Sequence, residues 1–144
     1  MRSLFIGDIH VALEAHLGTV TQANDYRTDA GLMVSTGYAA DATGSYLSGE
    51  VRGDSLLIQP DRLTREHQQG RLSLQVFGLT REPHLSRLYA LEEDIYKALR
   101  DTKFHPALSK VEFGTVKFGS SGNDSGEHFG VSVPVTFSFT HSPY

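Results

Sequence analysis

Chemistry in this chain would have to come mainly from histidines and carboxylates, because its 144 residues include no cysteine. Without cysteine there is no disulfide framework, thiolate zinc site or thiol nucleophile. The seven histidines are scattered, and none shows the H-x-x-x-H spacing of a helical metal pair; they stand at positions 10, 16, 67, 84, 105, 128 and 141. No G-x-S-x-G elbow supports a serine nucleophile. Surface or partly packed histidines are therefore expected, rather than ligands.

The sequence contains one short motif typical of a metal site. It is the tetrapeptide Gly7-Asp8-Ile9-His10, which follows the short apolar run at residues 4–6. It resembles the first metal-binding motif of the calcineurin-like metallophosphoesterases. The resemblance implies that Asp8 and His10 would reach one of two metal ions, which hold a bridging hydroxide and the phosphate between them.

The later motifs of that family are incomplete in this chain. Gly53-Asp54 lacks the family's second Asp, and Gly122-Asn123 is followed by Asp124 where the family has His. The alternative interpretation places Asp8 on the polar side of a helix. We therefore predict no catalytic, cofactor-binding or metal-binding residue, and metal-dependent phosphoesterase activity stands as an alternative function.

The bulk composition describes an ordinary soluble protein of one domain, residues 1–144. Apolar residues make up 39% and charged residues 21%, and the net charge of -4 favours neither nucleic-acid nor acidic-membrane binding. No apolar run approaches the ~20 residues that a membrane helix needs. The N-terminus does not read as a signal peptide, so we expect that nothing is cleaved.

Two segments have the apolar spacing of a helix. In residues 2–17, Phe5, Ile9, Leu13 and Leu17 fall on one face, although residues 4–6 could instead form a short strand ending at Gly7. Residues 84–100 carry a longer stripe, made of Leu85, Leu88, Leu91, Ile95 and Leu99. The charged side chains between them predict a solvated face, formed by Glu92, Glu93, Asp94, Lys97 and Arg100.

The clearest strand signal is the final run, residues 129–141. Its apolar and small polar residues alternate, which places one set on each sheet face; the apolar set is Val131, Val133, Val135, Phe137 and Phe139. Pro134 has no N–H for the ladder, so the strand should be an edge or bulged there. Further strands are predicted at residues 32–34, 55–59, 71–80 and 111–118.

The remaining segments are rich in turn formers. Residues 18–31 and 60–70 should be surface connections. Loops are expected near 37–54 and 119–128, and we predict that both are mobile in the free subunit. Strands 111–118 and 129–140 should pair antiparallel through the 119–128 turn.

Helices and strands in this order predict an α+β two-layer sandwich, in which two helices pack on one face of a small mixed or antiparallel sheet. This layout, together with the segment LGTVTQANDYRTDAG at 17–31, resembles the tail-terminator or tail-completion (minor tail) proteins of long-tailed bacteriophages.

The resemblance implies a virion structural protein rather than an enzyme. Such proteins assemble as a ring, commonly of six subunits, at the head-proximal end of the tail tube and stop its polymerisation. The implied partners are other copies of the chain, the tail tube protein and a head-completion or neck protein. The implied location is the virion tail or neck, assembled in the host cytoplasm. A third interpretation is an adaptor or binding domain of the same α+β class.

Overall fold

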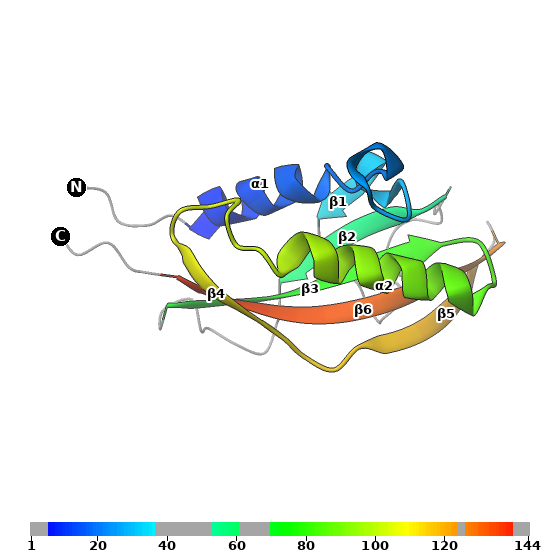
Figure 1. Ribbon diagram of the computed structural model, residues 1–144. Helices are drawn as coiled ribbons and strands as arrows, with labels where there is room; N and C mark the ends of the chain where they lie inside the picture. Colours follow the sequence, from blue (N-terminus) through cyan, green and yellow to red (C-terminus); the bar gives the residue numbers. More distant parts are fainter. Residues whose placement is uncertain (1–5, 37–52, 61–69, 124–125, 140–144) are drawn as a thin grey trace.

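The computed structural model describes residues 6–36, 53–60, 70–123 and 126–139. Two α-helices, two short 3-10 helices and six strands follow one another in this part of the chain (Figure 1). The order is α1 (Ile6–Leu17), η1 (Gln22–Asn24), η2 (Ala30–Leu32), β1 (Val34–Thr36), β2 (Ser55–Pro60), β3 (Arg71–Thr80), α2 (Leu85–Leu99), β4 (Leu108–Phe113), β5 (Lys117–Asn123) and β6 (Gly126–Phe139).

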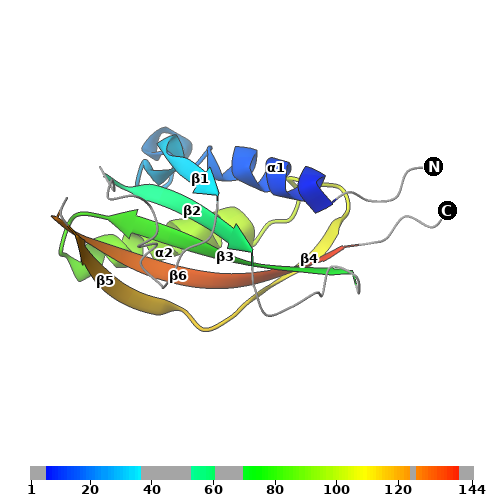
Figure 2. The ribbon, with the colours of Figure 1, turned by 180° about the vertical axis from the view of Figure 1, so that it is seen from behind.

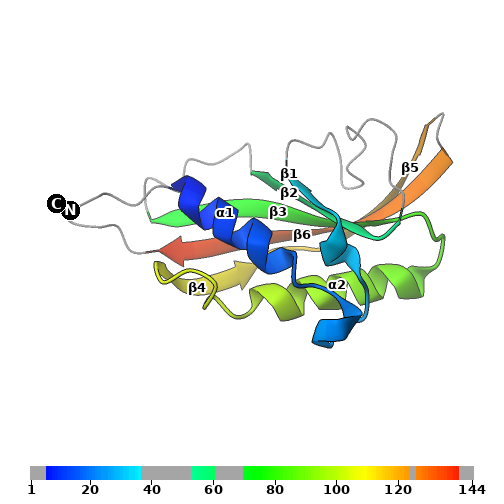
Figure 3. The same cartoon turned by 90° about the horizontal axis from the view of Figure 1, so that it is seen from above.

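The strands form one mixed sheet with the order β1-β2-β3-β6-β4, and β5 also pairs with β6. Only the β1–β2 pair is parallel among the described strands. Both helices lie on the same face of the sheet (Figure 3), and α2 lies behind the strands in the opposite view (Figure 2). The predicted α+β sandwich, with two helices on one face of a mixed sheet, is confirmed.

Strands β3 and β6 form the centre of the sheet, and they pair antiparallel over ten residues, from Arg71↔Ser138 to Thr80↔Phe129. Their alternating apolar residues point toward the helices and are buried, as predicted for the final strand. From β6 this set is Val131, Val133, Val135, Phe137 and Phe139, and from β3 it is Leu72, Leu74 and Val76. A period of two in both strands therefore builds one wall of the core.

Helix α1 supplies part of the cover. Ile9, Leu13 and Leu17 are fully buried on one side of it, as their spacing predicts. Ile6 already belongs to the helix, so the alternative strand at residues 4–6 is wrong at that position, while Leu4 and Phe5 lie outside the described residues. The helix ends at Leu17, before Gly18.

Helix α2 supplies the rest of the cover, but two predictions about it are wrong. Leu85 was predicted to be part of the buried apolar stripe, but it is 53% exposed. It is the first residue of the helix, and the buried residues begin at Leu88. Asp94 is 1% exposed, not solvated, because it lies on the same side of the helix as the buried Leu91 and Ala98.

The predicted strand at 111–118 is two strands. Phe113 pairs with Val135 and Lys117 pairs with Ser132, so the three residues 114–116 oppose only two residues of β6. This interruption lies opposite Pro134, whose carbonyl accepts a hydrogen bond from the Gly114 N–H at 2.9 Å. The N–H and C=O of a strand residue point to the same side, so the missing N–H of Pro134 faces the interruption. Strand β6 is not bulged at Pro134, because its register with β3 is unbroken there, but on the side of β4 and β5 it has no strand partner at that residue, as the predicted edge requires.

The connection predicted at 119–128 is also mostly strand. Residues 119–123 belong to β5, residues 126–128 begin β6, and only residues 124–125 lie between them outside the described chain. Ser120 is thus a strand residue rather than a turn residue. Turn-forming residues were misleading here because the ladder with β6 satisfies their backbone groups. The antiparallel pairing predicted across this segment is confirmed.

The segment 18–31 was predicted to be a surface connection, but part of it is buried. It contains η1 and most of η2, and Thr28 and Ala30 are fully buried within it. The strand predicted at 32–34 begins later, at Val34, because Leu32 ends η2 and is 72% exposed. Strand β2 reaches Pro60, close to its predicted end. Of the predicted connections at 37–54 and 60–70, residues 37–52 and 61–69 lie outside the described residues.

Candidate functional site

The Gly7-Asp8-Ile9-His10 motif lies within helix α1 rather than in a loop after a strand. Asp8 is exposed and His10 is half-buried. No group of three or more histidine, aspartate or glutamate side chains is suited to hold a metal ion among the residues that the structure describes. The phosphoesterase resemblance requires these residues in a loop at the end of a strand. Here they lie within a helix, so the local geometry differs from that of the family motif.

A buried carboxylate connects α2 to the polar segment between α1 and β1. Asp94 accepts hydrogen bonds from the backbone N–H groups of Arg27 and Thr28, both at 2.9 Å, and from the Thr28 hydroxyl at 2.7 Å. Three donors compensate a carboxylate for the water that it loses on burial. Asp94 thus holds the Tyr26-Arg27-Thr28 turn in place.

Two further residues of α2 hold the same turn from its exposed side. Glu93 forms an ion pair with Arg27, and its hydrogen bond is the main reason that the pKa of Arg27 is raised. Lys97 donates to the Asp25 carbonyl at 2.6 Å and lies over the ring of Tyr26, 4.7 Å from its centroid. Residues 25–28 are therefore a fixed corner packed on α2.

His16 joins the ends of the two helices. Its Nε2 lies 2.7 Å from the Ala98 carbonyl oxygen, and its ring stacks on Phe104 with 4.9 Å between centroids. Phe104 in turn meets Phe137 of the core edge-on. His16 is therefore a partly packed structural histidine, one of the two environments expected for the histidines of this chain.

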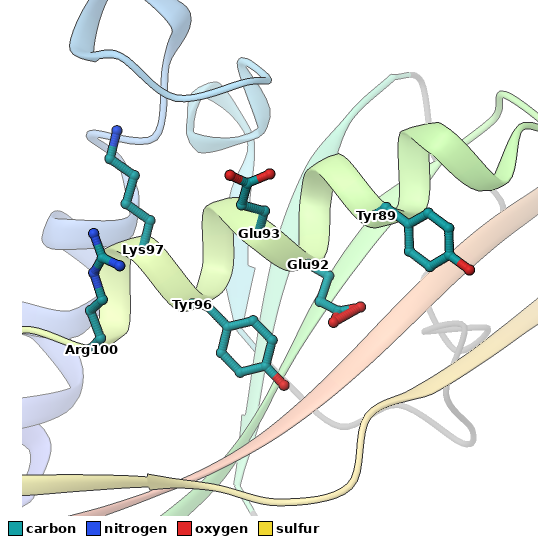
Figure 4. A pocket seen from close by; sticks show the side chains of 6 residues that line it. All are labelled: Tyr89, Glu92, Glu93, Tyr96, Lys97 and Arg100. Carbon is teal, nitrogen blue, oxygen red and sulfur yellow. The ribbon is translucent and has the colours of Figure 1, made fainter.

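A shallow groove of about 290 Å³ follows the outer surface of α2. Its lining side chains leave the helix on two sides (Figure 4): Tyr89, Glu92 and Tyr96 on one, and Glu93, Lys97 and Arg100 on the other. Partial burial raises the pKa of Tyr96, and the charge of Glu92 adds to the effect.

Two aromatic pairs connect this side of α2 to the strands beyond it. Tyr96 meets Phe113 of β4 edge-on, and Tyr89 meets Phe118 of β5 edge-on, with centroids 4.6 Å and 5.7 Å apart. The inner pair is half-buried, whereas Tyr89 and Phe118 remain 53% and 43% exposed. Exposed aromatic rings of this kind are common contributors to protein interfaces.

A second, wider groove of about 480 Å³ lies between α1 and β1. Its lining is mostly apolar or small, with Glu14 as the charged exception; the lining residues are Val11, Glu14, Ala15, Gly18, Gly31, Leu32 and Val34. Val11 is 66% and Leu32 is 72% exposed. Exposed apolar side chains gathered at a concave surface suit binding better than catalysis.

A comparison with known protein families and with curated proteins finds no match to this chain. No helix within the described ranges is long and apolar enough to cross a membrane. Sequence patterns did not reveal the groove between α1 and β1, because it joins segments that are distant along the chain. One sequence feature could have indicated an exposed apolar surface on this helix: Val11 lies away from the apolar stripe of Ile9, Leu13 and Leu17.

Proposed function

We propose that this protein is a virion structural protein of a long-tailed bacteriophage. It forms a ring, of six subunits by the resemblance, at the head-proximal end of the tail tube and ends tube polymerisation. The opposite surface of the ring joins a head-completion or neck protein. Its location is the tail or neck of the virion, after assembly in the host cytoplasm.

The observation that carries this proposal is the outer edge formed by β4 and β5. Among the described strands both pair only with β6, so one side of each backbone is available to another chain. Residues 126–128 of β6 pair with β5 beyond the last β3 partner, Phe129. A two-stranded ribbon is marginally stable by itself in water, and a neighbouring subunit or tube protein would complete it.

The experiment that tests the proposal mixes the purified chain with tail tubes of the phage that encodes it. Rings at one tube end in electron micrographs, and an arrest of tube elongation, are the expected results. Tubes that elongate unchanged in excess protein, and that carry no added density at either end, would contradict the proposal. An adaptor domain of the same class would bind a partner without stopping elongation.

The phosphoesterase alternative gains no support from the site geometry, since Asp8 and His10 lie on a helix. Metal analysis and a phosphodiester assay on the wild type and Asp8→Ala decide it. Metal-dependent hydrolysis that Asp8→Ala abolishes would establish the alternative, whereas equal and negligible activity in both proteins removes it.

A further inference from the structure

Two tyrosines and a glutamate leave α2 on the same side of the groove that follows this helix, and they are here named the tyrosine–glutamate cluster. Tyr89 and Tyr96 are two helical turns apart, about 10 Å along the axis, on one side of the helix. Glu92 lies between them (Figure 4). The cluster therefore presents one carboxylate with an aromatic ring on either side.

Phenylalanines of the neighbouring strands hold both tyrosine rings. Tyr96 meets Phe113 of β4 edge-on with 4.6 Å between centroids, and Tyr89 meets Phe118 of β5 edge-on at 5.7 Å. Rings that are fixed before a ligand arrives lose little conformational freedom when it binds. Tyr89 is 53% and Phe118 is 43% exposed, so ring surface is open to a ligand at this end of the cluster.

The Glu92 carboxylate has no cation of its own. The residue is half-buried, and no lysine, arginine or histidine forms an ion pair with it in the described part of the chain. Two charged residues on the other side of the groove are already engaged, since Glu93 pairs with Arg27 and Lys97 donates to a backbone carbonyl. A half-buried carboxylate without a cation is the feature of this groove that most directly calls for a positively charged ligand.

The nearest bases do not cancel this negative charge. Arg100, the remaining base of the groove, lies more than two turns beyond Glu92, about 12 Å along the axis, where salt screens most of its effect. Lys117 is next to Phe118 in β5, but adjacent strand residues point to opposite faces of the sheet, so its side chain leaves the face that is turned away from α2. An approaching cation therefore meets net negative charge at the cluster.

Arginine is the side chain whose chemistry matches these features. Its guanidinium group is planar, stacks on aromatic rings and donates paired hydrogen bonds to a carboxylate. A cation over the face of a tyrosine is also attracted by the ring itself. The ammonium group of lysine is a compact point charge, so it would use the carboxylate but gain less from the two rings.

We propose that the tyrosine–glutamate cluster binds an arginine side chain of a partner protein. Glu92 accepts hydrogen bonds from the guanidinium group, which lies between the rings of Tyr89 and Tyr96. An extended segment along the outer edge of β5 carries the arginine, because Phe118 of that strand contacts Tyr89 and no described strand pairs with that edge. Binding of this kind does not depend on the tail function.

Two pentapeptides that differ only in charge test the site. The probe is acetyl-Thr-Thr-Arg-Thr-Thr-amide, and its citrulline counterpart keeps the shape of the side chain without the charge. In an NMR titration of the isotope-labelled full chain, the arginine peptide should shift the α2 amides around residue 92, with a Kd on the order of 1 mM. The citrulline peptide should bind at least about tenfold more weakly. Hydrogen exchange of the β5 amides should slow when the arginine peptide is bound.

Variants of matched charge separate this site from a general attraction of cations to a chain with a net charge of -4. Glu92→Gln should weaken binding of the arginine peptide about tenfold. Glu14→Gln removes an exposed carboxylate of α1, away from the cluster, and should leave binding unchanged. Tyr89→Ala should weaken binding several-fold, whereas Tyr96→Phe keeps the ring and should bind as the wild type does. Circular dichroism checks that each variant is folded.

Several results would overturn the arginine site. They are the absence of any shift at about 10 mM peptide, equal binding of the arginine and citrulline peptides, and equal weakening by Glu92→Gln and Glu14→Gln. A lysine peptide that binds as tightly as the arginine peptide would show that charge alone decides, and would remove the two rings from the site. Binding that leaves exchange of the β5 amides unchanged would overturn the position of the extended segment.

The same variants separate the arginine site from the tail function. If the wild type binds the arginine peptide but does not stop tube elongation, the site stands and the tail function fails. If the peptide does not bind but rings form on tubes, the tail function stands and the site fails.

Discussion

At the scale of single residues, Asp94 is a buried polar residue with a large expected effect on stability. Its carboxylate accepts three hydrogen bonds from Arg27 and Thr28 while almost fully buried. Asp94→Ala leaves those donors without a partner, so we expect the free energy of unfolding to fall by about 3 kcal/mol. Urea denaturation measures the change. Glu93→Ala, which removes the neighbouring exposed ion pair, should cost less than about 1 kcal/mol; equal losses in the two variants would refute this role for Asp94.

Gly31 is a second residue at which little change is tolerated. A Cβ built there would lie 2.5 Å from the Leu17 carbonyl oxygen and 2.7 Å from the backbone N of Val20. The end of α1 cannot move away without losing core contacts, so Gly31→Ala should destabilise the fold by about 2 kcal/mol. Thermal unfolding checks this against Gly53→Ala, where no atom lies within 4 Å and the stability should be unchanged.

At the scale of elements, Pro134 marks the point where β4 gives way to β5. Its missing N–H faces the interruption, so Pro134→Val restores a donor that has no strand partner there. The unfolded chain also gains freedom, and together we expect a loss of about 1 kcal/mol in unfolding free energy. Chemical denaturation measures it. A stabilised variant would show that the proline restricts the strand pairing instead of fitting the interruption.

The β5–β6 pair yields a prediction about dynamics. Residues 131–132 and 135–137 of β6 pair with β3 on one side and with β5 or β4 on the other, whereas residues 126–128 pair with β5 alone among the described strands. We expect amides of residues 120–123 and 126–128 to exchange with solvent faster than those of 131–132 and 135–137 in the free subunit. Hydrogen exchange measured by NMR checks this. Equal protection along the whole of β6 before assembly would contradict it.

At the scale of the whole molecule, the uneven distribution of charge predicts salt-sensitive association. In the proposed ring, the acids of residues 6–36 and the bases of residues 100–123 would attract each other wherever these segments of two copies approach, and salt screens exposed charges. Raising the ionic strength from about 0.05 M to about 0.5 M should therefore weaken self-association several-fold, as sedimentation would measure. Lys117→Glu should weaken it at low salt and matter little at high salt. Association that strengthens with salt would indicate a contact dominated by apolar burial.

The amino-acid sequence by itself determined the helices and strands in which apolar residues recur at a regular spacing. The period of two in β3 and β6 and the apolar spacing in α1 and α2 predicted the secondary structure and most of the core, because burial on one side imposes a period on the residues that form it. The sheet-plus-two-helices architecture followed, since these faces can only bury one another.

Only the tertiary structure decided where those elements meet. The burial of Asp94 depends on donors at residues 27 and 28, far along the chain, and the division between β4 and β5 depends on which edge of β6 they share with Pro134. The exposed aromatic pair Tyr89 and Phe118 and the groove at Val11 and Leu32 have the same origin. Each of these features involves segments that belong to different helices and strands. No periodic pattern within one segment predicts which residues of another segment will lie against it, so these features depend on packing alone.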